Sequence, residues 1–344
     1  MAHAACDAPY GCWVDALPLA RAAIERAAHR RGGPVLATAW AAGTTRVLLV
    51  RDGLVATRSC PKGTELDLVH PGEIAPQPPA ESPRHVPVFL GEDDDGAYLA
   101  LVVIEHDDPD DAADPDDAAD LPVLRGRTWS TLRDVGHLLG DRDVDLAATG
   151  VALAAWHQRN RRCGRCGAPN VPAAAGWTRR CPVDGTEDYP RTDPAVIMAV
   201  TDDADRILLG HAAHWPTRRF STLAGFVEPG ESAEAAVRRE VAEEVSVAIG
   251  ELEYVASQPW PFPNSLMLAY RAHALTTEIT VDGEEMAEAR WFTRAELQTA
   301  VRDGDVLLPM RSSVARVLIE SWYGGRLDAG DDPGPGDLAV PPGR

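Results

Sequence analysis

Three glutamates, Glu240, Glu243 and Glu244, lie three and four residues apart in a stretch with helical periodicity. On a helix this spacing places the three carboxylates on one face, where their like charges repel each other. The apolar positions beside them would pack the helix against a sheet. A solvated acidic face is one interpretation. The other is a divalent cation that offsets the charge, and hard oxygen ligands suit Mg²⁺ or Mn²⁺.

The formal net charge of −20 is unevenly distributed along the 344 residues. Residues 105–120 contain nine acidic side chains and no Lys or Arg, and residues 92–95 contain four more. We interpret 105–120 as a disordered acidic loop, because it repels itself and has little apolar surface to bury. The overall acidity, and the absence of a basic patch interleaved with aromatic residues, argue against general nucleic-acid binding.

Several other classes of protein are excluded by composition. The chain has no apolar run near the roughly 18–20 residues of a membrane-spanning helix, and no secretory signal is visible at its start. Six cysteines in 344 residues are too few for a disulfide scaffold. We therefore expect a cytoplasmic protein that does not contact a membrane.

The order of expected elements predicts an α+β protein of several parts. Residues 1–158 form an N-terminal α+β domain, 159–190 a small module, 191–323 a second α+β domain, and 324–344 a disordered tail.

Within these parts, the N-terminal domain is expected to hold antiparallel strands and a helix over 15–29. Apolar runs that alternate with turn signals mark short segments at 35–40, 46–50, 86–90 and 98–104. A further helix is expected at 146–161. The second domain should contain strands at 195–200, 206–209, 252–257 and 266–274, and helices at 232–245, 294–302 and 312–323.

A cysteine cluster occupies the small module. Cys163 and Cys166 form one CxxC pair, whereas Cys181 is followed three residues later by Asp184. Two CxxC pairs at this separation are typical of a zinc ribbon. The fourth ligand position could be filled by Asp184 or by water, or it could stay empty. A carboxylate is a harder ligand than a thiolate and is therefore less typical of a structural zinc site. The sequence leaves open a structural Zn²⁺ site and a metal-free, eroded ribbon.

Residues 225–247 resemble the Nudix box, in the order Gly225-x5-Glu231-x7-Arg239-Glu240-x2-Glu243-Glu244. Proteins with this box hydrolyse a diphosphate linked to another moiety. The resemblance implies that Glu240, Glu243 and Glu244 are catalytic and bind the metal, and that Glu231 and Arg239 form a structural ion pair. Ser246 stands where the family usually has glycine.

Residues 257–265, Ser-Gln-Pro-Trp-Pro-Phe-Pro-Asn-Ser, resemble the motif of the NADH pyrophosphatase (NudC-type) subfamily. By themselves they predict a stiff, extended loop with two aromatic rings. The resemblance implies further metal contacts at the Ala224 carbonyl and at Glu285, for which Glu288 is the competitor. The residues that it implies for substrate binding are Gln258, Pro259, Trp260, Pro261, Phe262, Pro263, Asn264, Ser265, Tyr189, Phe226, Ala315 and Arg133.

The resemblance as a whole implies a Nudix fold, with a mixed sheet between helices, after an N-terminal α+β domain and a zinc-ribbon-like module. It implies hydrolysis of NAD(H) to nicotinamide mononucleotide and AMP with Mg²⁺ or Mn²⁺, removal of NAD caps from RNA, and a homodimer. Two alternatives stay open. One is another Nudix substrate such as ADP-ribose or a nucleoside triphosphate, and the other is a non-catalytic nucleotide sensor.

Overall fold

The computed structural model describes residues 17–61, 63–78, 84–104 and 121–327. The predicted disordered loop at 105–120 lies outside these residues, as does the predicted disordered tail beyond residue 327. Leu327 itself is buried, and its backbone N–H donates to Glu320. The chain is therefore packed for a few residues beyond the predicted end of the second domain.

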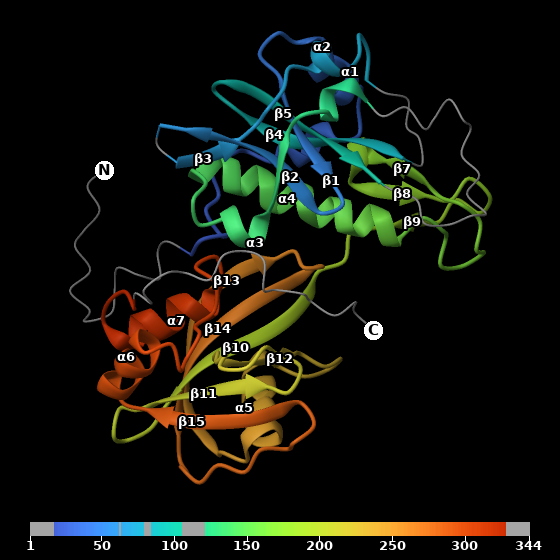
Figure 1. The fold of residues 1–344 in the computed structure, drawn as a ribbon. Helices are drawn as coiled ribbons and strands as arrows, with labels where there is room; N and C mark the ends of the chain where they lie inside the picture. The colour runs from blue at the N-terminus through green and yellow to red at the C-terminus, as the bar shows by residue number, and fades with distance from the viewer. Residues whose placement is uncertain (1–16, 62, 79–83, 105–120, 328–344) are drawn as a thin grey trace. The chain divides into compact units, whose positions relative to one another are not determined.

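Two compact units make up the fold (Figure 1). The N-terminal unit comprises Leu19–Thr192 and the short segment Pro259–Ser265. Among the described residues, the C-terminal unit comprises 17–18, 193–258 and 266–327. The cysteine module is thus counted with the N-terminal unit.

The N-terminal unit is built on a mixed sheet in the order β3-β2-β1-β5-β4, with β6 paired to β2. Its strands are β1 (Arg46–Arg51), β2 (Leu54–Cys60), β3 (Gly63–Leu66), β4 (His85–Asp93), β5 (Gly96–Val103) and β6 (Thr128–Thr131). Its helices are α1 (Val35–Ala41), α2 (Pro71–Ile74), α3 (Leu132–Val135) and α4 (Asp141–Arg159), with 3₁₀ turns at Ala28–Arg30 and Pro122–Leu124. The prediction of antiparallel strands was wrong for β1 and β5, which are parallel. The long connection between them makes this pairing possible.

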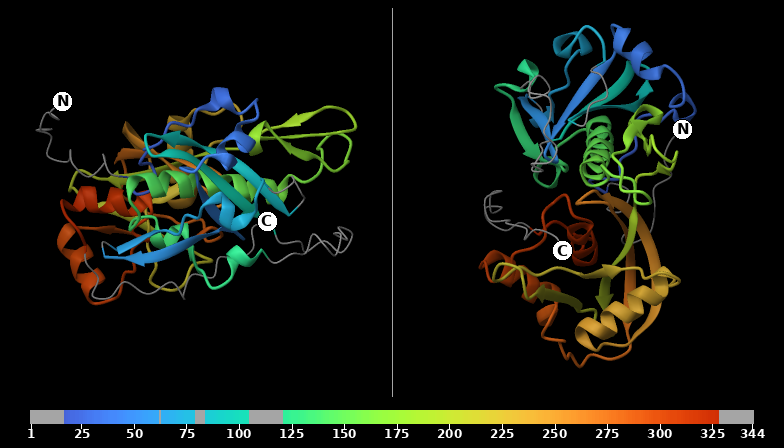
Figure 2. Two further views of the ribbon diagram at one scale, coloured as in Figure 1. Left: turned by 90° about the horizontal axis from the view of Figure 1, so that it is seen from above. Right: turned by 90° about the vertical axis from the view of Figure 1, so that its right-hand side faces the viewer.

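Helix α4 packs against this sheet (Figure 2). Its Leu146 and Val151 are buried with Leu48 and Ala100 of the central strands. Gly150 permits a close approach, because a Cβ there would lie 2.9 Å from a methyl group of Leu48. The predicted helix at 146–161 is therefore present, but it begins five residues earlier and ends two earlier.

The predicted helix at 15–29 was wrong over the residues that the structure describes. The backbone N–H groups of Ala23 and Ile24 donate to the Asp145 carboxylate of α4, and Glu25 pairs with Glu92 of β4. These tertiary hydrogen bonds replace helical ones, so local propensity is overridden. The helix in this region, α1, follows Pro34 and covers one of the short apolar runs.

The cysteine module forms a small sheet of β7 (Val171–Ala173), β8 (Thr178–Arg180) and β9 (Glu187–Asp188), with a 3₁₀ turn at Ala174–Gly176. His157 of α4 fixes it in place. Burial lowers the pKa of His157 to about 4, so the ring is neutral. Its Nε2–H donates to the Gly176 carbonyl at 2.8 Å, and its Nδ1 accepts from Arg179 at 3.0 Å. The end of α4 and the module are thus joined through a buried histidine.

The C-terminal unit contains a sheet in the order β13-β14-β10-β11-β15, with β12 paired to β10. Its strands are β10 (Asp193–Thr201), β11 (Ile207–Ala212), β12 (Leu223–Phe226), β13 (Ile249–Trp260), β14 (Ser265–Ala274) and β15 (Met286–Phe292). Its helices are α5 (Ala233–Val245), α6 (Arg294–Arg302) and α7 (Val314–Tyr323).

Successive side chains of strand β10 point to opposite faces of the sheet. Both of these faces are covered. Met198 is buried in the same cluster as Val237 and Val241 of α5, whereas Ile197 is buried with Leu318 of α7. Helices α5 and α7 therefore lie on opposite faces of the sheet (Figure 2). This confirms the predicted fold, a sheet between helices. In the described part of the chain, no helix combines the length and apolar character needed to cross a membrane.

Candidate active site and metal centres

Helix α5 carries the three glutamates that the sequence pattern placed on one face. Ser232 caps its start by accepting a hydrogen bond from the Ala235 N–H, and its apolar side is buried on the sheet. The carboxylates differ in their surroundings. The Glu243 side chain is 62% exposed, whereas Glu240 and Glu244 are largely buried. Electrostatic repulsion is therefore strongest between the buried carboxylates of Glu240 and Glu244, where water screens the charges least.

Arg239 joins the helix to the loop before it. Its guanidinium donates to both carboxylate oxygens of Glu231, at 2.9 and 2.8 Å, and to the Phe226 carbonyl. It also donates to Glu240 and Glu243. The ion pair with Glu231 is therefore present, and the same arginine offsets part of the charge of the box.

Gly225 brings strand β12 directly against Glu240. A Cβ atom at position 225 would lie 1.9 Å from the carboxyl carbon of Glu240, which no side chain can tolerate. The glycine is thus required for space, and not for an unusual backbone angle. Ala224, whose carbonyl is a predicted metal contact, is the residue before it in the same strand.

The carboxyl group of Glu244 is strongly affected both by burial and by its acidic neighbours. Burial raises its pKa to about 8, and the charges of Glu240, Glu285 and Asp282 contribute. Among the described residues, its buried Oε2 atom has no hydrogen-bond partner. A buried polar atom without a partner is costly. The donor set, all hard carboxylate oxygens, fits a divalent cation.

The charge of Glu285 acts on this cluster, whereas its competitor Glu288 forms an ion pair elsewhere. The charge of Glu285 helps to raise the pKa of both Glu240 and Glu244. Glu288 instead pairs with Arg290 at 3.0 Å.

Asp282 is the residue of this region that sequence reasoning missed. Its carboxylate accepts the backbone N–H groups of Glu285 and Met286, which holds the turn that carries Glu285. These hydrogen bonds, with that from Met286 the largest, lower the pKa of Asp282. The Asp-Gly turn signal at 282–283 could have found it.

We expect Glu285→Gln to lower kcat/KM by about tenfold to a hundredfold, the range typical of changes beside a metal site. The matched variant Glu288→Gln should stay within about twofold, because Glu288 contributes to a surface ion pair alone. Steady-state kinetics at saturating Mg²⁺ would compare the two. Equal effects would remove Glu285 from the proposed metal site.

Ser246 ends helix α5 in the left-handed conformation, with φ of 60°. The family's usual glycine adopts this conformation without strain, whereas serine does not. The geometry of the helix end is therefore retained despite the substitution. We expect Ser246→Gly to stabilise the fold by about 0.5 to 1 kcal/mol, and Ser246→Ala to give no gain. Urea unfolding measures both, and an equal gain from alanine would contradict this explanation.

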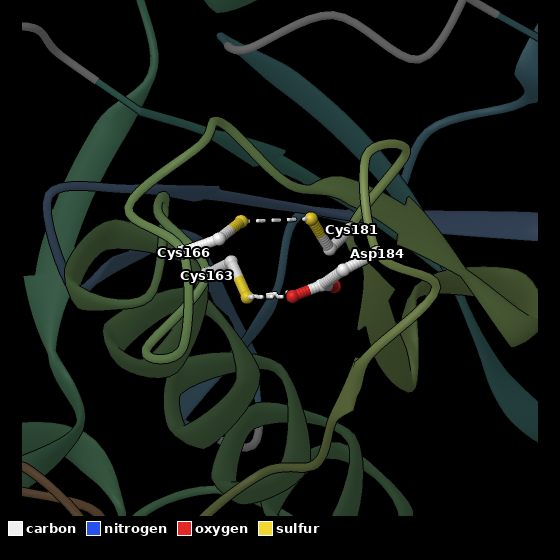
Figure 3. A group of neighbouring side chains, drawn as sticks. All are labelled: Cys163, Cys166, Cys181 and Asp184. Atoms are coloured by element: carbon white, nitrogen blue, oxygen red, sulfur yellow. Dashed lines mark hydrogen bonds between the residues drawn. The ribbon is translucent and has the colours of Figure 1, made fainter.

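The cysteine cluster converges from two turns of the module (Figure 3). Each sulfur of the first turn, which carries Cys163 and Cys166, faces one ligand atom of the second turn, which carries Cys181 and Asp184. Cys166 Sγ lies 3.5 Å from Cys181 Sγ, and Cys163 Sγ lies 3.7 Å from Asp184 Oδ2. All four ligand atoms lie within 4.8 Å of one another. A tetrahedral zinc site with bonds of about 2.3 Å requires sulfurs about 3.8 Å apart, so the cluster fits Zn²⁺.

Asp184 occupies the place of a fourth cysteine. Hydrogen bonds from the backbone N–H of Thr186 and from neighbouring groups lower the pKa of its carboxyl, so it is available as an anionic ligand. We expect purified protein to contain about one zinc per chain by elemental analysis. Asp184→Cys should retain the metal, whereas Asp184→Ala should weaken its retention against a chelator. Less than about a tenth of a zinc per chain would favour the eroded ribbon.

The tip of hairpin β13–β14 carries the proline-aromatic motif. Trp260 and Phe262 meet edge to face, with their ring centroids 4.9 Å apart, and both pack on the core of the N-terminal unit. Arg133 lies over both rings, at 4.5 Å from the Phe262 centroid and 5.6 Å from that of Trp260. The predicted extended loop is in fact strand as far as Trp260, and its rings are half buried.

The other predicted substrate residues have varied surroundings. Tyr189 and Phe226 are exposed, as side chains that meet a ligand can be. Gln258 is buried and donates to the Ser312 carbonyl. The Ala315 N–H donates to Ser313 at the start of α7. Gln258 and Ala315 therefore already have structural hydrogen bonds.

These residues divide between the two units. The C-terminal unit holds the acidic cluster together with Phe226, Gln258 and Ala315. The N-terminal unit holds Tyr189, Arg133 and the hairpin tip, which includes the predicted Pro259, Pro261, Pro263, Asn264 and Ser265. The charges of Glu240 and Glu285 act on Glu244, and separately Arg133 lies over the rings of Trp260 and Phe262.

Comparison with known families gives three consecutive matches. Residues 31–156 match an NADH pyrophosphatase-like rudimentary NUDIX domain, and residues 158–189 match the NADH pyrophosphatase zinc ribbon domain. Residues 191–310 match the NUDIX domain. The rudimentary domain corresponds to the mixed sheet with α4, and the zinc ribbon to the module that holds the cysteines.

The chain is also similar to individual proteins. The chain is 42% identical over 267 residues to the NAD-capped RNA hydrolase NudC of Mycobacterium bovis, covering 73% of this chain and 78% of that protein. It is 40% identical over 196 residues to the NAD-capped RNA hydrolase NUDT12 of Homo sapiens, covering 54% and 42%. A crystal structure of a NUDIX hydrolase from Nitrosomonas europaea is 23% identical, with a TM-score of 0.38, and covers 48% of this chain and 94% of that one.

Proposed function

Because the chain belongs to the Nudix hydrolases of the NADH pyrophosphatase type, we propose that it hydrolyses the diphosphate of NAD(H). The products are nicotinamide mononucleotide and AMP. The names of its relatives support the same reaction on NAD-capped RNA, where the diphosphate lies between nicotinamide mononucleotide and the first nucleotide.

The observation that carries this proposal is Glu244, a buried carboxylate without a partner in the described structure, inside an acidic cluster. Glu240, Glu243, Glu244, Glu285 and the Ala224 carbonyl would hold the divalent cation, for which we propose Mg²⁺ or Mn²⁺. When bound, such a cation would supply positive charge to offset the diphosphate and would lower the pKa of a bound water. Arg239 keeps the box in position through Glu231 and the Phe226 carbonyl.

For the nucleotide we propose contacts from the residues that the resemblance implies. Tyr189 and Phe226 offer exposed aromatic rings, which can stack on planar bases. Trp260 and Phe262 offer the faces that their packing leaves accessible, and Arg133 adds a positive charge beside them. These roles come from the resemblance of the motif and are proposals for this chain.

The test compares turnover of NADH, NAD⁺, ADP-ribose and NAD-capped RNA on one preparation, with Mg²⁺ and with Mn²⁺. We expect NAD(H) or capped RNA to have the highest kcat/KM. Equal or greater activity on ADP-ribose would overturn the assignment, and no turnover of any of the four would favour a nucleotide sensor. A non-catalytic nucleotide sensor does not need metal-binding carboxylates. The presence of Glu240, Glu243 and Glu244 therefore argues against that alternative.

Assembly and location are separate proposals. The homodimer that the resemblance implies and the cytoplasmic location that the composition predicts both stay predictions. Sedimentation or light scattering at low protein concentration would test the dimer.

A further inference from the structure

The segment 280–282 is attached to the carboxyl end of α5. The Thr280 N–H donates to the Val245 carbonyl at 3.1 Å, and the Asp282 N–H donates to the Glu244 carbonyl at 3.4 Å. The last carbonyls of a helix have no partner within the helix, so these hydrogen bonds satisfy groups that would otherwise need water. The backbone of Asp282 is therefore fixed at the residue that carries the buried carboxylate of the acidic cluster.

The side chain of Asp282 holds the turn that follows. Its Oδ1 atom accepts the N–H of Met286 at 2.9 Å and that of Glu284 at 3.3 Å, and its Oδ2 atom accepts the N–H of Glu285 at 3.2 Å. Aspartate side chains commonly fix turns by accepting backbone N–H groups a few residues ahead. Both oxygens are thus engaged by the backbone, in contrast to the Glu244 Oε2 atom, which has no partner among the described residues.

Glu285 depends on this turn for its position. The residue is exposed, so packing against the core contributes little to fixing it. Its backbone is held on both sides, because its N–H donates to Asp282 and its carbonyl accepts the Ala213 N–H at 2.9 Å. Loss of the Asp282 carboxylate would release one of these two sides.

We propose that Asp282 is a positioning residue for the divalent cation, whose backbone holds the helix end at Glu244 and whose side chain holds the turn at Glu285. This inference deepens the proposed function and rests on it, since both glutamates are proposed ligands of the cation. Asp282 does not touch the cation. It keeps two ligands from separate segments in one arrangement, and groups that orient metal ligands in this way contribute about tenfold to a hundredfold to metal affinity.

The test variant is Asp282→Ala, and Asp282→Asn separates position from charge. Asparagine keeps an oxygen that accepts backbone N–H groups and favours the same turn, but it lacks the negative charge. Binding of Mn²⁺ to the whole protein without substrate is measured from the electron paramagnetic resonance signal of free Mn²⁺. We expect the alanine variant to raise the Kd for Mn²⁺ by at least about tenfold, and the asparagine variant by no more than about threefold.

Asp202→Ala is the matched control. Asp202 fixes the turn between β10 and β11 of the same unit in the same manner, because its carboxylate accepts the N–H groups of Ala204 and Arg206 at 3.1 and 2.8 Å. It is also buried and pairs with the Arg206 side chain, so its loss should lower the melting temperature at least as much as loss of Asp282. No proposed metal ligand lies on that turn, and the Kd for Mn²⁺ should stay within about twofold.

Unchanged Mn²⁺ affinity in Asp282→Ala, or an equal loss in Asp202→Ala, would overturn the positioning role and leave the proposed function standing. An equal loss in the asparagine and alanine variants would overturn it too, because the carboxylate would then act through its charge or as a ligand. Asp282→Ser, which fixes a turn more weakly, should fall between them and replaces the alanine variant if that one does not fold. Equal Mn²⁺ binding by Glu244→Gln and the unmodified protein would overturn the proposed metal site itself.

Discussion

Replacing Glu244 with glutamine should lower kcat by about a thousandfold and leave the fold intact. A metal ion contributes several kcal/mol of transition-state stabilisation, and about 4 kcal/mol corresponds to that factor. The glutamine side chain keeps the shape of glutamate but lacks the charge that holds a cation. In the presence of a chelator the variant should unfold at a higher temperature than the unmodified protein, because it lacks a buried charge that its acidic neighbours repel.

Glu234→Gln is the matched control, since Glu234 is an exposed residue in the first turn of the same helix. It should keep both the rate and the melting temperature of the unmodified protein. Addition of Mg²⁺ or Mn²⁺ should stabilise the unmodified protein and the control, but not Glu244→Gln. A near-normal rate in Glu244→Gln would refute the metal role of this residue.

Gly225→Ala should have the second largest effect, although it adds one methyl group. The new Cβ would overlap the Glu240 carboxyl group, so either the strand or the glutamate must move. Overpacking of this kind costs about 1 to 3 kcal/mol of stability. A misplacement near 1 Å in an active site can lower the rate by about a hundredfold. Kinetics and thermal unfolding would measure the two effects.

Gly43→Ala is the control for this change, because a Cβ at Gly43 would meet nothing within 4 Å. We expect it to alter neither rate nor stability measurably. The double variant Gly225→Ala, Glu240→Ala removes the overlapping group. It should regain the lost stability but not the activity, and a double variant as unstable as Gly225→Ala would contradict the steric explanation.

The fold of the C-terminal unit was predictable from local signals. Helix α6 has the predicted bounds, and the end of α5 is as expected, because their apolar spacing and capping residues agree with the final packing. The segment before α1 was not predictable. Its backbone hydrogen bonds go to Asp145 and to β4, distant partners that no local pattern contains. The parallel pairing of β1 with β5 was not predictable for the same reason, because it joins strands that are distant in the sequence.

The candidate site was predictable in its residue types but not in its electrostatics. The spacing indicated that the glutamates share a face, yet burial, which separates the exposed Glu243 from Glu244, depends on the sheet and on the turn at Asp282. The different surroundings of Glu285 and Glu288 likewise arise from tertiary structure.

The hairpin tip has a consequence for how this protein can vary. Trp260 and Phe262 share one packing environment with Arg133, which lies far from them in the sequence. A change in ring size at either position alters the surface on which the guanidinium rests, and loss of the arginine removes the cation from both rings. These three positions should therefore evolve as a set. Chimaeras that exchange the continuous segment 193–323, which carries both rings but not the arginine, should work best when both parents share the same three residues.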